Sequence, residues 1–229
     1  MVPEYGQKVF AAPRGALDLL LVRHGQSEAF VPGRPFPLVA GQGNPALSAE
    51  GRAQAERVAE RLGDEGAQAL YVTNLIRTAQ TAAPLARRIG LTPVVEADLR
   101  EVHLGEWEGG LFRQKVAEGD PVALEMAERE RWDVIPGAEH AADLEARVRG
   151  AIERMAARHA GQRIVAFTHG GIIGEVLRLA SGGRAFAFTG SENGSISQIV
   201  VVGDRWIIRR FNDTAHLTAG SAIVSAPLS

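Results

Sequence analysis

The chain has 229 residues, of which 45% are hydrophobic and 23% charged, a composition typical of a single globular α/β domain. A formal net charge of −2 excludes a generally basic surface for nucleic acid or an anionic membrane, and the lack of cysteine excludes disulfides, thiolate metal sites and cysteine nucleophiles. No apolar run approaches the ~20 residues of a membrane span and residues 1–18 have no signal-peptide core, so we expect a cytoplasmic protein.

In the first half of the chain, apolar runs that predict strands alternate with amphipathic segments that predict helices. In order, we expect an arm over residues 1–16, a strand over 17–22, a Pro- and Gly-rich loop over 29–46, a helix that Ser48 caps and Gly63 and Gly66 end, a strand over 69–72, a helix from Thr73 or Asn74 to Gly90, and a strand over 94–95. The loop is long for a compact domain, and such loops are often functional.

The second half of the chain continues the alternation. In order, we expect a connection over residues 99–110, helices over 111–132 and 140–159 separated by Pro136-Gly137, a strand over 163–168, a helix over 172–180, a hairpin of 197–202 with 206–208, and a tail over 218–229. Alternating strands and helices predict an α/β three-layer sandwich with a mostly parallel central sheet and helices on both faces. We expect one domain over residues 17–217 between a flexible arm and a flexible tail.

Two of the predicted strands end in a histidine followed by glycine. His24 follows the apolar run at residues 19–22, and His169 follows Thr168 at the end of the strand over residues 163–168. Ligands bind at the carboxyl ends of strands in open α/β sheets, so two neighbouring strands would bring both imidazoles to one edge. A neutral imidazole is a nucleophile near neutral pH, and phosphorus is its natural electrophile. The alternative interpretation is a buried structural histidine at either position.

Arginines close to these strand ends are suited to clamp a phosphate, because the planar guanidinium binds phosphate oxygens through two N–H groups. Arg23 precedes the first histidine, and Arg77 lies near the start of a predicted helix, whose free N–H groups favour anions. From its position alone, Arg77 is better explained as a solvated charge on a helix.

A departing alkoxide needs a proton, and three glutamates are candidates for its donor: Glu101, Glu106 and Glu108. The residues alone do not choose among them. The sequence contains no set of residues with metal-ligand spacing. We therefore expect no metal and no other cofactor.

At this point the ordered motifs resemble the histidine phosphatase superfamily, also called phosphoglycerate-mutase-like, over residues 17–217. The similarity rests on Arg23-His24-Gly25-Gln26-Ser27, Leu47-Ser48-x-x-Gly51-x-x-Gln54-Ala55, the segment around Arg77, Leu99-x-Glu101 with Gly105-x-Trp107-Glu108-Gly109, Pro136-Gly137-x-Glu139 and Thr168-His169-Gly170-Gly171. The chain is similar to the branch that opens with Arg-His-Gly-x-Ser/Thr. The branch of acid phosphatases and phytases has an arginine at the position of Ser27 and a late His-Asp pair where this chain has His169-Gly170.

The resemblance implies that His24 becomes phosphohistidine and that Glu101 is the proton donor. It also implies a phosphate pocket around the opening motif. The implied catalytic residues are His24, Glu101 and His169, and the implied phosphate-binding residues are Arg23, Arg77, His169 and Ser27.

Three departures from the family pattern fall where the leaving group should bind. Phe30 replaces an asparagine common in the family, Gly41-Gln42-Gly43-Asn44 replaces Gly-Trp-x-Asp, and Ala138-Glu139-His140 replaces Gly-Glu-Ser. The resemblance therefore leaves the substrate open. Candidates for an outer substrate pocket are Gln26, Phe30, Arg34, Phe36, Trp107 and Phe112, with loop packing as the alternative role.

The function that the sequence favours is a phosphomonoesterase that acts on a small phosphorylated metabolite through a phosphohistidine. One alternative is a cofactor-dependent phosphoglycerate-type mutase, but residues 111–135 mix acidic and basic side chains and do not form the basic insertion of such mutases. The other alternative is a non-catalytic phospho-ligand binding protein, which the complete set of site residues disfavours. We expect neither nucleic acid nor membrane partners. The sequence leaves the oligomeric state open, a homodimer included.

Overall fold

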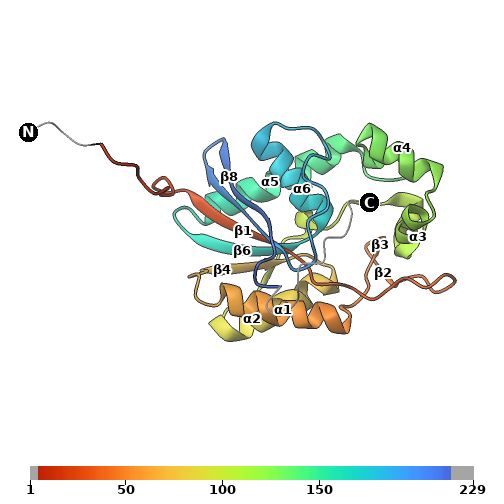
Figure 1. The fold of residues 1–229 in the computed structure, drawn as a ribbon, viewed down its shortest axis with the longest axis horizontal. Helices are drawn as coiled ribbons and strands as arrows, with labels where there is room; N and C mark the ends of the chain where they lie inside the picture. The colour runs from red at the N-terminus through yellow and green to blue at the C-terminus, as the bar shows by residue number, and fades with distance from the viewer. Residues whose placement is uncertain (1–4, 218–229) are drawn as a thin grey trace, which may run out of the picture.

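The computed structural model describes residues 5–217 (Figure 1). Residues 5–16 of the predicted arm contain no helix or strand and extend from one end of the molecule. Residues 1–4 and the whole predicted tail, 218–229, lie outside the described residues. No described helix is long and apolar enough to cross a membrane.

A six-stranded sheet in the order β5-β4-β6-β1-β7-β8 forms the middle layer (Figure 1). Its strands are β1 (Leu17–Arg23), β4 (Ala69–Val72), β5 (Val94–Val95), β6 (Arg163–Thr168), β7 (Ile196–Val202) and β8 (Arg205–Asp213). The strands from β5 to β1 pair in parallel, whereas β7 and β8 pair antiparallel. The predicted three-layer α/β fold with a mostly parallel sheet is confirmed.

Helices cover both faces of this sheet (Figure 1). One face carries α1 (Ala49–Leu62) and α2 (Ile76–Ile89), and the other carries α5 (Ala141–Arg158) and α6 (Gly170–Ser181). The apolar run of β1 is continuous because its side chains point alternately into the two hydrophobic cores on either face of the sheet. Leu19 and Leu21 pack with residues of α5 and α6, while Leu20 and Val22 pack with residues of α1 and α2.

The start of α2 differs from the prediction. The helix begins at Ile76, and the residue before it, Leu75, makes no side-chain capping bond. The predicted cap Thr73 is not a cap because its hydroxyl lies 3.0 Å from Nε2 of His169 and accepts the N–H of Leu75 at 3.2 Å. The predicted end is confirmed, since Gly90 has the left-handed conformation that glycine favours.

The predicted helix over residues 111–132 is instead broken into α3 (Leu111–Ala117) and α4 (Pro121–Arg129). These helices belong to an insertion over residues 105–139, which also contains η2 (Gly105–Gly110) and η3 (Trp132–Val134). The helix breaks because Gly119 has a positive φ, Asp120 caps α4 through the N–H of Val122, and Pro121 follows. The insertion has its own apolar cluster, with Trp107, Met126 and Ile135 buried.

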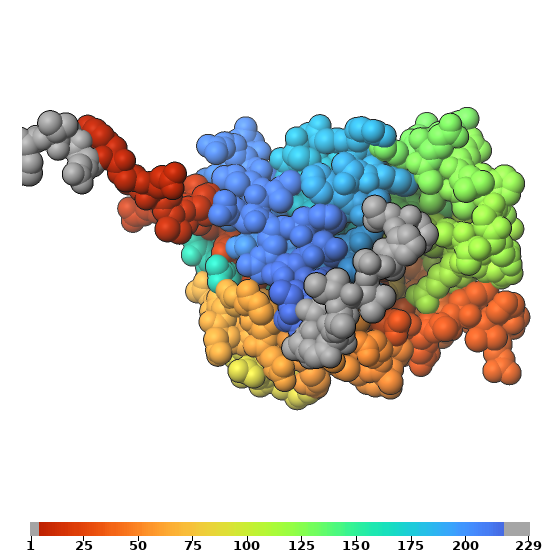
Figure 2. All heavy atoms as spheres, in the orientation of Figure 1, coloured from red at the N-terminus to blue at the C-terminus, as the bar shows by residue number. Residues whose placement is uncertain are grey.

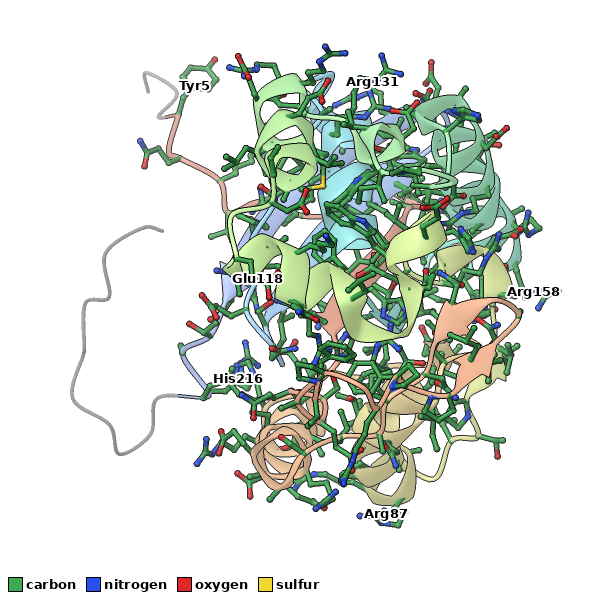
Figure 3. The ribbon with its side chains drawn as sticks, turned by 90° about the vertical axis from the view of Figure 1, so that its right-hand side faces the viewer. Tyr5, Arg87, Glu118, Arg131, Arg158 and His216 are labelled. Atoms are coloured by element: carbon green, nitrogen blue, oxygen red, sulfur yellow. The ribbon has the colours of Figure 1, made fainter. Side chains whose placement is uncertain are left out.

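The insertion lies at the end of the molecule opposite the N-terminal arm (Figures 1 and 2). In the space-filling view it adjoins the predicted loop over residues 29–46, which contains a small hairpin of β2 (Leu38–Val39) and β3 (Gln42–Gly43). Viewed from this end, the insertion, marked by Glu118 and Arg131, lies above α1 and α2, the latter marked by Arg87 (Figure 3). Arg23 at the end of β1 and the following His24 line a cavity together with residues of this loop and of the insertion.

Candidate active site

The two strand-end histidines meet as predicted. Strands β1 and β6 pair in parallel with Arg23 opposite Thr168, so the next residues, His24 and His169, are neighbours at the sheet edge. Their ring centroids are 5.2 Å apart, and both side chains are buried. The N–H of His24 donates to the carbonyl of Thr168 at 3.0 Å, which ties the two strand ends together.

The hydrogen bonds of His24 fix which ring nitrogen is free. Nδ1 lies 2.7 Å from the carbonyl oxygen of Gly25, and because a carbonyl can only accept, Nδ1 carries the proton. Burial, followed by the charges of Arg77 and Arg23, holds the pKa of His24 well below its ordinary value. The ring is therefore neutral, and Nε2 has a free lone pair.

The second histidine has the complementary pattern. Nε2 of His169 lies 3.0 Å from the hydroxyl of Thr73, whereas its Nδ1 is buried without a hydrogen-bond partner. Burial, followed by the charge of Arg77, lowers the pKa of His169 well below its ordinary value. Buried polar atoms without a hydrogen-bond partner are uncommon, so Nδ1 of His169 is a candidate ligand-binding atom.

Arg23 and Arg77 bring two guanidinium groups to the same place. Arg23 donates through Nη1 to the carbonyl of Ser191, and its buried Nε has no partner. Arg77, the second residue of α2, donates to the carbonyl of Gly43 at 3.0 Å. Burial lowers the pKa of Arg77 to about 10, against the opposing charge of Glu101, so the group stays charged at neutral pH. Among the described ion pairs neither guanidinium has a carboxylate partner, which leaves both for an anion.

Of the three candidate proton donors, Glu101 lines the cavity beside both arginines. Its charge raises the pKa of both neighbouring arginines, Arg23 and Arg77, and its Oε1 accepts the N–H of Val102 at 3.0 Å. A Cβ at Gly171 would lie 2.6 Å from this oxygen, so the glycine at the start of α6 makes room for the carboxyl group.

The other two glutamates have different positions. Glu106 is exposed and does not line the cavity. Glu108 does line it, but its two oxygens accept the N–H groups of Gly43 at 2.7 Å and Leu104 at 2.9 Å. Glu108 therefore joins the β2–β3 hairpin to the insertion.

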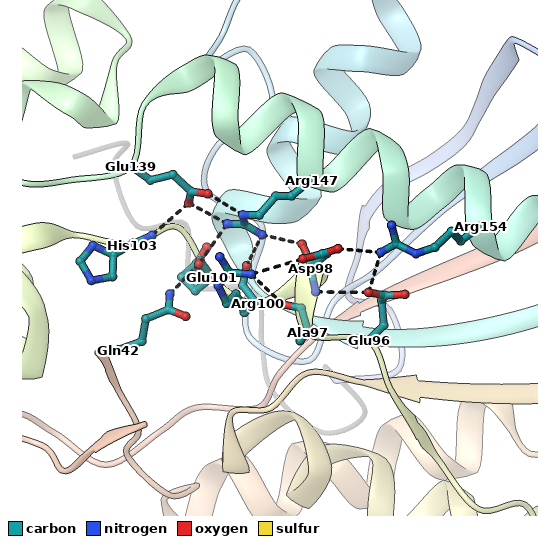
Figure 4. Close-up of polar contacts among 10 residues, drawn as sticks. All are labelled: Gln42, Glu96, Ala97, Asp98, Arg100, Glu101, His103, Glu139, Arg147 and Arg154. Carbon is teal, nitrogen blue, oxygen red and sulfur yellow. Dashed lines mark hydrogen bonds and ion pairs between the residues drawn. The ribbon is translucent and has the colours of Figure 1, made fainter. Parts of the chain in front are cut away.

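A buried ion pair holds the main chain that carries Glu101 (Figure 4). Arg147 of α5 donates to the carbonyls of Asp98, Arg100 and Glu101 at 2.5, 2.9 and 3.2 Å. Glu139 pairs with the same guanidinium at 2.5 Å, and the two side chains are only 9% and 10% exposed. Burial by itself raises the pKa of Glu139, but the hydrogen bond and charge of Arg147 outweigh it and lower that pKa.

Arg113 of α3 is a cavity-lining residue that sequence reasoning did not select. Its Nη1 donates to the carbonyl of Glu28 and its Nη2 to the hydroxyl of Ser27, each at 2.7 Å, and the group lies over the ring of Phe36. Burial, followed by the charge of Arg23, lowers the pKa of Arg113. The ion pairs of the described residues do not include it. Its contacts join segments about 85 residues apart, and only its basic character could have signalled it.

The cavity at this site has a volume of about 260 Å³, and only some of the remaining predicted residues line it. Phe36, Trp107 and Phe112 line it, but Gln26, Phe30 and Arg34 do not. Gln26 and Arg34 are exposed, and Phe30 packs its ring against Phe36, 5.9 Å between centroids.

Ser27, predicted to bind phosphate, is buried and also does not line the cavity. Its hydroxyl accepts from Arg113, so its contribution to a ligand is indirect. Gln42, a further residue that sequence reasoning missed, lines the cavity and donates to the carbonyl of Glu101 at 2.6 Å. Across residues 5–217, no three His, Asp or Glu side chains gather as a metal-binding group.

Comparison with known proteins gives consistent matches. A family model described as histidine phosphatase superfamily (branch 1) matches residues 19–214. A metal-independent phosphoserine phosphatase of Arabidopsis thaliana is 32% identical over 207 residues, which are 88% of this chain and 84% of the relative. A phosphoglycerate mutase-like protein 4 of the same plant is 34% identical over 205 residues, 87% of this chain and 86% of the relative. The native structure of a mycobacterial glucosyl-3-phosphoglycerate phosphatase superposes with a TM-score of 0.73 at 30% identity, covering 87% of this chain and 100% of that one.

Proposed function

The chain belongs to the histidine phosphatase superfamily, and we propose that it hydrolyses a small cytoplasmic phosphomonoester through a phosphohistidine formed on His24. One observation carries the proposal: a buried, neutral His24 has its Nε2 free beside guanidinium groups without carboxylate partners. A nucleophile next to unneutralised cations is the arrangement that transfer of a phosphoryl dianion requires.

Binding of the phosphoryl group uses the donors that the protein leaves unpaired. Arg23 and Arg77 clamp its oxygens, and Arg113 adds a third guanidinium where the family's usual asparagine is replaced. His169 also donates. The Thr73 hydroxyl lies 3.0 Å from Nε2 of His169, and with this hydroxyl as the donor the ring proton stays on the unpartnered Nδ1, available to the phosphate.

Transfer then proceeds in two balanced steps. Nε2 of His24 attacks phosphorus, the bond to the ester oxygen breaks, and protonated Glu101 gives its proton to the departing alkoxide. A water molecule next attacks the phosphohistidine, and the Glu101 carboxylate takes a proton from that water. Inorganic phosphate leaves, His24 regains its lone pair, and Glu101 regains its proton.

Hydrolysis is favoured over the mutase reaction by the charges of the insertion. A mutase needs cations that hold a second phosphate. Of the basic residues in the described insertion, residues 105–139, those other than Arg113 pair with acidic neighbours: Lys115 with Asp120, Arg129 with Glu125, and Arg131 with Asp133. Arg113 alone is too little charge for a second phosphate.

Two substitutions test the proposal. His24→Ala should lower phosphate release from 4-nitrophenyl phosphate by more than about 10⁴-fold, as when a unit of catalytic residues is broken, while His140→Ala, at an exposed histidine, should not. Glu101→Gln should lower kcat/KM by ~10²–10⁴-fold on an alkyl phosphate and much less on 4-nitrophenyl phosphate, whose leaving group needs no proton. Glu106→Gln is the matched control. Retained turnover in His24→Ala refutes the phosphohistidine, and isomerisation of 3-phosphoglycerate without net phosphate release would favour a mutase.

A further inference from the structure

The cavity has two chemically different ends. The phosphate end holds Arg23, His24, Arg77 and Glu101. The wall of the other end is apolar and largely aromatic, and it consists of Phe36, Val102, Leu104, Trp107, Phe112 and Trp132. A leaving group attached to a phosphate on His24 has to lie against this wall.

The aromatic side chains of the wall are held in place by their own packing. Phe112 lies between Trp107 and Trp132, with ring centroids 6.2 and 6.1 Å apart, and Trp132 is backed by Phe186 at 4.8 Å. Trp107 is only 6% exposed and belongs to the core of the insertion. The wall is therefore preformed, and an apolar ligand needs no rearrangement to use it.

Polar groups beside this wall are already engaged. Both oxygens of Glu108 accept main-chain N–H groups, and Arg113, assigned above to the phosphate pocket, gives two of its five N–H groups to Ser27 and Glu28. Among the described lining side chains away from the phosphate end, Gln42 adds one unpartnered acceptor, Oε1. A sugar or polyol would give up several hydrogen bonds to water against a wall of apolar and aromatic side chains, which is unfavourable.

We propose that the aromatic end is a leaving-group subsite that selects phosphomonoesters of apolar alcohols bearing one ring. This substrate class rests on the proposed phosphatase function of the same cavity. The volume of about 260 Å³ is below the roughly 300–1,000 Å³ of sites for drug-sized ligands. It suits a phosphoryl group with a single ring rather than a larger metabolite.

Binding of phosphonates tests the subsite without turnover, because their carbon–phosphorus bond is not cleaved by this chemistry. Calorimetry with the full chain should give benzylphosphonate a Kd at least about tenfold below that of methylphosphonate, since even one methylene in an apolar pocket is worth about tenfold or more. 3-Phosphonopropionate, which carries a carboxylate in place of the ring, should bind no better than methylphosphonate. Equal binding of all three, or a preference for the carboxylate, overturns the proposal.

A matched pair of variants locates the effect. Phe112→Ala, and the milder Phe112→Leu if the first fails to fold, should remove most of the preference for benzylphosphonate and leave the Kd of methylphosphonate within about twofold. Phe188→Ala is the control, because this half-buried ring packs against Phe211 and does not line the cavity. If the preference survives in both Phe112 variants, the subsite is elsewhere and the proposal fails.

The same samples separate this proposal from the proposed function. Failure of the wild-type chain to release phosphate from any ester, together with tight benzylphosphonate binding, would refute the phosphatase and leave the subsite standing. Normal hydrolysis that depends on His24, together with equal phosphonate affinities, would refute the subsite alone.

Discussion

Removing the carboxylate of Glu139 should be among the most damaging single changes outside the phosphate pocket. Glu139→Ala leaves the guanidinium of Arg147 buried, where the native pair is joined at 2.5 and 2.8 Å and is about one-tenth exposed. Breaking a buried pair by removing one partner costs about 3–5 kcal/mol, since an uncompensated charge stays buried. For a domain of this size 1 kcal/mol shifts Tm by about 2–4 °C, so Tm should fall by roughly 6–20 °C.

The variant series separates charge from geometry. Glu139→Gln keeps an oxygen acceptor for Arg147 and should cost about 1.5–3 kcal/mol, the range for hydrogen bonds to charged groups. Glu56→Ala is the matched control, because its ion pair with Arg87 is 62% and 68% exposed, and exposed pairs contribute about 0–1 kcal/mol. Differential scanning calorimetry gives the Tm of each variant, and urea unfolding gives its free energy of unfolding.

Glu139→Ala should also change the enzyme's activity, in a way that stability alone would not. Arg147 holds the carbonyl of Glu101, so a displaced Arg147 should lower kcat/KM more on an alkyl phosphate than on 4-nitrophenyl phosphate. A variant that is merely less stable would lose activity equally on both esters at a temperature where it is folded. If Glu139→Ala melts within 2 °C of the wild type, the estimate of about 3–5 kcal/mol for this buried pair is refuted.

The pH dependence of this effect has a definite sign. The pKa of Glu139 is lower in the folded chain than in the unfolded one, so its stabilisation is present above the ordinary glutamate pKa of about 4.3 and fades as pH falls below it. The difference in stability between wild type and Glu139→Gln should therefore shrink below about pH 4.3. A difference that grows toward acid pH would contradict the assigned pKa direction.

Three further predictions follow from the site. Because burial and neighbouring arginines lower the pKa of His24, kcat/KM for 4-nitrophenyl phosphate should not fall between pH 7.5 and 5.5, and a fall centred near the ordinary value of ~6.5 would contradict this. Thr73→Val should raise the Kd for inorganic phosphate by roughly 5–100-fold, because Nε2 of His169 loses its donor. Thr73→Ser keeps the hydroxyl and should restore binding. An unchanged Kd in Thr73→Val would show that Thr73 does not support phosphate binding. Arg113→Gln should weaken phosphate binding about tenfold or more, whereas Arg87→Gln, at an exposed arginine, should not. Equal Kd values in the two variants would exclude Arg113 from the phosphate pocket.

Local patterns were enough to predict the sheet and the meeting of the two histidines. The apolar run of β1 and the strand of β6 read directly as buried strands, and parallel neighbours present their carboxyl ends at one edge. The helix α1 was equally readable, because Ser48 accepts the N–H of Gly51 as a capping side chain should. These features depend on residues that are close in sequence.

Contacts between distant segments were beyond such patterns. Arg113, Gln42 and Arg147 act through hydrogen bonds to main-chain oxygens, and such bonds place no demand on the type of residue that they reach. The predicted cap of α2 was wrong for the same reason, since the hydroxyl of Thr73 contacts His169, which lies 96 residues further along the chain. The break at Pro121 has a different cause, because Gly119, Asp120 and Pro121 are local signals of a helix end and a new helix start that the prediction of one helix overlooked.

The structure explains why positions 25 and 51 of the matched motifs are glycine. A Cβ at Gly51 would lie 1.9 Å from the carbonyl oxygen of Gln26, and a Cβ at Gly25 would lie 2.4 Å from the carbonyl oxygen of Gly51. The segment after His24 therefore packs directly on the first turn of α1, with no side chain between the two backbones. This contact fixes the carbonyl of Gly25, which in turn orients the imidazole of His24.

Gly51→Ala should consequently damage catalysis more than stability. Overpacking costs about 1–3 kcal/mol, but the added methyl group must displace the segment that orients His24, and a shift of about 1 Å at a reacting group lowers the rate about 10²-fold. Gly150→Ala is the control, since a Cβ at this glycine of α5 meets only the flexible end of Arg154 at 3.3 Å and helix propensity favours alanine. The assay is kcat/KM for 4-nitrophenyl phosphate together with Tm. A Gly51→Ala variant with the wild-type kcat/KM would show that the close backbone contact does not set the orientation of the nucleophile.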